Sequence, residues 1–221
     1  MELTGDLFSP TLRWWLGALY ALALFKALRM APWRRLRDTE QLHVFLGACV
    51  SLILLWSMRI QAVPGLQFHM LGVTSLTLMF GWSLAVLAAS LALLAVTLNG
   101  AAGWDGFVLS SFTLALLPIT LTQVLLVVVR SLLPKNFFIY VLVNGFFTGG
   151  LAALASGYAA VGLLLWSGSH SLAGLRETLL PFFPLMFLPE GLLNGWIMTV
   201  LAALRPHWLS SFDDDLYIRG K

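Results

Sequence analysis

The chain has 221 residues, of which 59% are hydrophobic and only 10% are charged, and its mean hydropathy is +0.88. A soluble domain carries about 25% charged residues, so this composition excludes a soluble globular protein and predicts an all-α integral membrane bundle. The net charge is +3, and the basic residues gather in short loops, which indicates membrane topology rather than nucleic-acid binding.

The apolar segments predict a single membrane domain of about seven transmembrane helices. A leader at residues 1–10 lacks the basic region of a signal peptide, so we expect it to be retained. Residues 66–98 carry no acidic or basic side chain apart from His69 and exceed one span of about 20 residues, so we divide them around Gly81. The predicted spans are 12–30, 42–57, 66–80, 83–98, 107–129, 137–166 and 179–204, and residues 205–221 form a cytoplasmic tail.

The basic residues also orient the predicted bundle. If the N-terminus is outside, ten lysines and arginines fall on the inner side and three, Arg13, Arg59 and Arg176, on the outer side. The positive-inside rule therefore predicts an outer N-terminus and a cytoplasmic C-terminus. This orientation places the leader and His69 on the same, outer, side, where the two can meet.

Several potential metal ligands share that outer side. Imidazole, amine and carboxylate groups together suit a borderline divalent ion such as nickel, cobalt, copper or zinc. Neither an HExxH nor a CxxC motif is present, and the alternative interpretation of His69 is a helix-capping or interhelical hydrogen bond. The candidates are the α-amino group of Met1, Glu2, Asp6, His69, Asp105, His170 and Glu190.

Glu190 lies inside an apolar segment, FLPEGLLNGW, with Asn194 one turn further along the same helix face. A buried carboxylate is unfavourable unless it is paired or protonated. Two interpretations stay open. Glu190 and Asn194 either line or support a substrate path, or make structural hydrogen bonds to neighbouring helices or to backbone groups freed by Pro189.

Small residues four apart on the first span predict a close approach by a partner helix. These pairs are Gly17 with Ala21 and Ala23 with Ala27. The chain contains no G-x-x-x-x-G-K-[ST] loop and no GxSxG nucleophile. We therefore do not expect an enzyme, and any energy for active transport must come from a partner or an ion gradient.

Four stretches resemble the CbiM/NikM family, which comprises membrane substrate-binding subunits of energy-coupling-factor ABC transporters for cobalt and nickel. The resemblance implies a permease subunit in the plasma (inner) membrane that captures a divalent transition-metal ion and has no permanent cofactor. It also implies a transmembrane coupling protein and cytoplasmic ATPase subunits as partners. The stretches are LFSP at 7–10, VPG at 63–65 with HMLG at 69–72, residues 81–106, and LPEGLLNG at 188–195 with the following RPHWLSSFDDDLYI.

The family's metal ligands are the terminal amine, a histidine at the second position and the histidine of an HLLG motif. By resemblance this implies that Met1 and His69 bind metal here. The second position is Glu2, and a carboxylate in place of imidazole favours a different metal, weaker binding or a different substrate. The alternative function is a membrane scaffold or assembly factor without a metal site, which predicts no saturable ligand.

Overall fold

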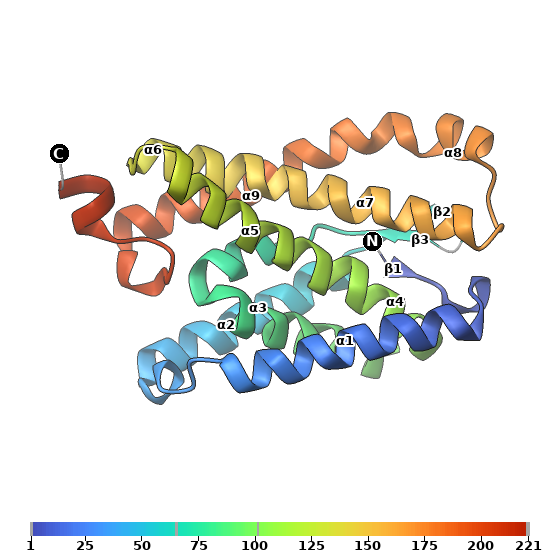
Figure 1. The fold of residues 1–221 in the computed structure, drawn as a ribbon, viewed down its shortest axis with the longest axis horizontal. Helices are drawn as coiled ribbons and strands as arrows, with labels where there is room; N and C mark the ends of the chain where they lie inside the picture. The colour runs from blue at the N-terminus through green and yellow to red at the C-terminus, as the bar shows by residue number, and fades with distance from the viewer. Residues whose placement is uncertain (1, 65, 101, 220–221) are drawn as a thin grey trace.

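The helices run side by side along the length of the molecule, and the C-terminal tail lies at one end (Figure 1). The computed structural model describes residues 2–64, 66–100 and 102–219. The longer helices are α1 (Pro10–Met30), α2 (Thr39–Ser57), α3 (Val73–Leu98), α5 (Leu117–Leu132), α7 (Thr148–Trp166) and α9 (Phe183–Leu204). The shorter helices are α4 (Phe107–Ser110), α6 (Phe137–Ile139) and α8 (Leu172–Thr178), and π-helical turns cover Ser111–Leu116, Tyr140–Phe147 and Asp215–Arg219. Short 3-10 turns cover Gly5–Leu7, Arg35–Arg37, Trp104–Gly106, Leu180–Phe182 and Pro206–Trp208.

Within the described ranges, five helical segments are long and apolar enough to cross a membrane. The prediction of a multi-pass helical membrane protein is confirmed at this level. The difference from seven spans arises at α1, which carries Arg13, Lys26 and Arg29 and is not among the five, and at α3, which counts once. The number of spans and the orientation of the termini stay predictions. The five segments are Thr39–Ser57, Val73–Leu98, Trp104–Leu132, Phe137–Trp166 and Leu180–Leu204.

Gly81 divides α3 into two arms, at the position where the sequence predicts a division. Its φ of 80° and ψ of 169° lie in a region that is open essentially to glycine alone. The first arm, 73–80, ends in carbonyls that accept hydrogen bonds from outside the helix. Met79 O accepts from Arg35 Nη1 at 2.9 Å and from Ser210 N at 2.9 Å. A cation is favourable at this helix end, because it complements the helix dipole.

The start of the predicted span 66–80 is wrong, because Leu66–Phe68 forms the strand β3 rather than helix. This strand is the middle of a three-stranded antiparallel sheet of order β1-β3-β2, with β1 at Glu2–Leu3 and β2 at Ile60–Val63. The sheet is a small addition to a mostly helical fold, which is consistent with the all-α prediction. Its two neighbours supply the hydrogen bonds that the backbone of β3 would otherwise make within a helix.

The leader is folded into the bundle. Leu3 is 1% exposed, and its amide donates to Ser110 Oγ at 3.3 Å. The Gly5 amide donates to Asp105 Oδ2 at 2.9 Å. The fit is close, since a Cβ on Gly5 would lie 2.0 Å from the carbonyl oxygen of Asp105. The leader is therefore a fixed part of the molecule in this structure.

The predicted C-terminal tail packs back on the helices. Phe212 and Tyr217 are buried, and both rings contact Tyr140, at centroid distances of 4.8 Å and 5.3 Å. Arg130 Nη2 donates to the carbonyl of Ser211. Of the aspartate run, Asp213 and Asp215 are exposed. The tail is thus anchored by its aromatic side chains while its acidic residues stay at the surface.

Candidate functional site

His69 lies in the loop between β3 and α3, with its ring 5.5 Å from the Trp56 ring. Its Nδ1 is 3.0 Å from the carbonyl oxygen of Met70. A carbonyl can only accept, so Nδ1 carries the proton and Nε2 keeps its lone pair. Nε2 is buried and has no hydrogen-bond partner in the described part of the chain. Imidazoles that bind metals have this arrangement, with one nitrogen held by a backbone carbonyl and the other free to coordinate.

The environment of His69 keeps the imidazole neutral. Burial lowers the pKa of His69 well below its ordinary value, because a charged ring loses solvation there. A metal ligand must be deprotonated, so this shift prepares the ring to bind a cation at neutral pH.

The backbone after His69 is held from two sides. Trp56 Nε1 donates to the Leu71 carbonyl at 3.0 Å. The amides of Leu71 and Gly72 donate to the two carboxylate oxygens of Glu190, each at 2.7 Å. Gly72 has a φ of 67°, a left-handed conformation that glycine adopts without strain. The loop that carries His69 is therefore fixed by α2 and by α9.

Glu190 and Asn194 connect α9 to the start of α3. Asn194 Nδ2 donates to Glu190 Oε1 at 2.8 Å. Asn194 Oδ1 accepts from Ser75 N at 2.8 Å and from Ser75 Oγ at 2.7 Å. Among the described residues, every hydrogen bond to the Glu190 carboxylate comes from an N–H group, which is the pattern of an ionised, acceptor-only carboxylate. These hydrogen bonds connect α9 to the start of α3, and the part of Glu190 and Asn194 in a substrate path stays a prediction.

The leader reaches the segment that leads into His69. Glu2 pairs with Gln67 and Leu3 pairs with Leu66 in antiparallel register. Moving from Leu3 to Glu2 along the leader therefore moves toward His69 along β3. Met1 lies outside the described residues, as does the side chain of Glu2. The backbone of the leader therefore lies beside the strand that leads to His69. The predicted ligands on the leader are the Met1 amine and the Glu2 carboxylate.

The other predicted ligands lie elsewhere or have structural partners. Asp6 is exposed, Asp105 holds the leader through Gly5, and His170 contacts Ser169 at 3.0 Å. No group of three or more histidines, cysteines, aspartates and glutamates that could hold a metal ion occurs among the residues described. The leader beside β3 is the predicted source of further ligands for His69.

A cavity of about 640 Å³ adjoins His69. It lies between the end of α2, the 69–71 loop and the start of α9, and we call it the His69 cavity. Its walls include Glu190 and Arg59, and Arg59 Nη1 donates to Gln67 Oε1 at 3.1 Å. Three thioether side chains also line it, those of Met58, Met70 and Met186. The loop that carries His69 therefore borders an open space that Glu190 also lines.

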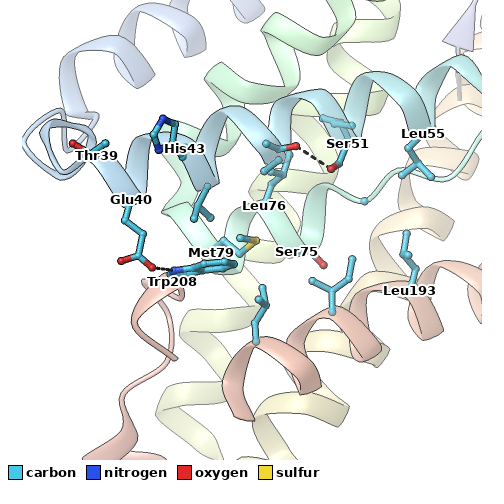
Figure 2. Close-up of a pocket in the computed structure, with 17 residues that line it drawn as sticks. Thr39, Glu40, His43, Ser51, Leu55, Ser75, Leu76, Met79, Leu193 and Trp208 are labelled. Carbon is cyan, nitrogen blue, oxygen red and sulfur yellow. Dashed lines mark hydrogen bonds between the residues drawn. The ribbon is translucent and has the colours of Figure 1, made fainter. Parts of the chain in front are cut away.

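A larger cavity of about 920 Å³ runs along α2 and has a mostly apolar lining (Figure 2). Its polar end holds His43 and Glu40, and Figure 2 shows Glu40 bonded to Trp208, whose Nε1 donates to Glu40 Oε1 at 2.7 Å. Leu55 lines both cavities. This larger cavity is a poor metal site, because the Glu40 carboxylate already accepts a hydrogen bond from Trp208 and most of the lining is apolar.

The small residues predicted for a partner helix face mostly inward. Ala23 and Ala27 are buried, and a Cβ on Gly17 would lie 3.7 Å from Val108 of α4. Of the predicted four, only Ala21 is exposed. Their small size therefore lets α1 approach helices of its own chain, which corrects the prediction for Gly17, Ala23 and Ala27 in this conformation.

Residues 6–208 match a family model described as "Cobalt uptake substrate-specific transmembrane region". The fold is similar to a crystal structure of a transition metal transporter, with a TM-score of 0.72 and 19% identity over 92% of this chain and 91% of that chain. It is also similar to a truncated transition metal transporter, with a TM-score of 0.66 and 20% identity over 92% and 97% of the two chains. Comparison with curated proteins by sequence gives no match.

Proposed function

Because the chain belongs to the CbiM family, we propose that it captures a divalent transition-metal ion of the cobalt–nickel type for uptake across the plasma (inner) membrane. The family match supports a membrane component of metal uptake, and we propose a transport subunit that works with partner subunits and is not an enzyme. In the proposal the partners are a transmembrane coupling protein and cytoplasmic ATPase subunits. The metal is the transported substrate, and the protein holds no permanent cofactor.

The observation that carries the proposal is the buried Nε2 of His69, which has no hydrogen-bond partner among the described residues. A buried polar atom without a partner is destabilising, and a bound cation satisfies it. The proposed further ligands are the Met1 amine and the Glu2 carboxylate. The β1–β3 register supports this choice, because it brings Glu2 opposite Gln67, two residues before His69. Nitrogen ligands with one carboxylate suit borderline divalent ions.

Metal titration of the purified full chain with Co²⁺ and Ni²⁺ tests the proposal. We expect saturable binding that weakens more than about tenfold in His69→Ala and with a Gly-Ser extension before Met1, because loss of groups that merely orient ligands already lowers affinity about 10–100-fold. His170→Ala is the matched control and should bind as the natural chain does. Saturable binding that neither change weakens contradicts the site, and no saturable binding at all favours the scaffold alternative.

A further inference from the structure

Glu190 is a buried carboxylate without a cationic partner in the ranges that the structure describes. The residue is 3% exposed, and its carboxylate oxygens accept from Leu71 N, Gly72 N and Asn194 Nδ2. These N–H dipoles stabilise the anion, and two of them come from the residues just before α3, where the helix dipole also favours negative charge. They do not neutralise it. A buried ion is unfavourable unless an opposite charge compensates it.

The Glu190 carboxylate binds the loop that carries the proposed ligand His69. Leu71 and Gly72, which it binds, are two and three residues after His69, and Glu190 and His69 line the same cavity. In a buried environment, salt screens the interaction between two charges only weakly, and the low dielectric constant makes this interaction stronger. The negative charge of Glu190 would therefore stabilise a cation bound at His69 Nε2.

We infer that Glu190 is the counter-charge of the captured cation and the positioning residue of the His69 loop. The inference rests on the proposed function, since it assumes that the ion binds at His69. Of the proposed ligands, the imidazole and the deprotonated amine are neutral and the Glu2 carboxylate carries one negative charge, so a divalent ion keeps one positive charge to be compensated. The carboxylate of Glu190 supplies that negative charge from within the bundle, and the bound ion in turn compensates the charge of the carboxylate. This arrangement favours divalent over monovalent ions.

The charge of the ion distinguishes this role from a purely structural one. Coulomb energy is proportional to the ion's charge. Loss of the Glu190 charge should therefore reduce the binding free energy of a divalent ion about twice as much as that of a monovalent ion at the same site. If Ag⁺ affinity falls about threefold, Co²⁺ affinity should fall about tenfold. A change that only displaces the loop should weaken both ions by similar factors.

The test compares Co²⁺ and Ag⁺ affinities of the natural full chain, Glu190→Gln and Asn194→Ala, measured by competition with a metal-binding dye. Glu190→Gln keeps the size of the side chain and removes its charge, and we expect it to lower the ratio of Co²⁺ to Ag⁺ affinity by about threefold. Asn194→Ala removes one N–H donor from the carboxylate but keeps the charge, so the ratio should stay unchanged.

Equal losses for both ions in Glu190→Gln, or no loss, would overturn the counter-charge. If the natural chain binds neither ion, the proposed function fails. If binding depends on His69 but Glu190→Gln leaves the ratio of Co²⁺ to Ag⁺ affinity unchanged, the proposed function stands and Glu190 is not the counter-charge. Should Glu190→Gln not fold, infrared spectra of ¹³C-glutamate-labelled natural protein with Co²⁺ give the answer. We expect only ionised glutamates, and a labelled protonated carboxyl band that resists deuterium exchange would overturn the inference.

Discussion

The carboxylate of Glu190 and the amide of Gly72 are 2.7 Å apart although 118 residues separate them in the chain. This contact joins α9 to the residue that caps α3. Because the same carboxylate also holds Leu71, the position of the His69 loop is set by the packing of the bundle and not by local sequence alone.

Gly72→Ala should destabilise the protein and weaken metal binding. Its φ of 67° is strained for alanine, and the added Cβ would lie 3.0 Å from Leu55 Cδ2. We expect the free energy of unfolding to fall by about 1–3 kcal/mol, measured by thermal or denaturant unfolding, together with a lower Co²⁺ affinity. Gly47→Ala in α2 is the control, because its Cβ meets no atom within 4 Å. Similar losses in both variants would contradict the role of the Gly72 conformation.

Trp56→Phe tests the other side of the loop. The indole is 1% exposed and donates to the Leu71 carbonyl, so phenylalanine leaves a buried acceptor unpaired. We expect a loss of about 1–3 kcal/mol in the free energy of unfolding and weaker Co²⁺ binding in the same titration. Trp196→Phe is the matched control, since Trp196 is 76% exposed and should tolerate the change. Unchanged Co²⁺ affinity in Trp56→Phe would show that this hydrogen bond does not position His69.

Local signals in the sequence predict the membrane class and the break at Gly81. They also identify His69 as a candidate ligand, which stays a prediction. The strand β3 could not be predicted in this way, because Leu66–Phe68 is a strand only through pairing with Glu2–Leu3 and Ile60–Val63. Hydropathy reports how apolar a short run is, and such a run fits helix or strand equally well. One of the two partner strands is also distant in the chain, since 65 residues separate Glu2 from Gln67.

The same limit applies to the residues around the site. The sequence identifies Glu190 as a buried carboxylate but cannot supply its donors, which are backbone amides of a distant loop. Trp56 carries no signal beyond its place at the end of an apolar run, where an interface anchor is the ordinary interpretation. In α1 the small residues predict close helix approach correctly, yet spacing does not say whether the neighbour belongs to the same chain.

Acid should destabilise the metal-free protein partly through His69. Burial lowers the pKa of His69 in the folded state well below its ordinary value, while an unfolded histidine titrates near 6.5. Below about pH 6.5 the unfolded chain therefore binds a proton that the folded chain does not, so stability falls as the pH decreases toward the folded pKa. His69→Gln should show a shallower fall in melting temperature between about pH 6.5 and 5. Parallel curves for the two proteins would contradict the shift.

Gly5→Ala should separate docking of the leader from folding of the bundle. The new Cβ would lie 2.0 Å from the Asp105 carbonyl oxygen, and backbone cannot move aside as a flexible side chain can. We expect the leader to detach, with faster hydrogen exchange at the Leu3 amide and Co²⁺ affinity lowered by at least about tenfold. Gly17→Ala is the control, because its Cβ would meet Val108 at an ordinary 3.7 Å. If Gly5→Ala frees the Leu3 amide but leaves Co²⁺ binding intact, then the ligands beside His69 do not come from the leader.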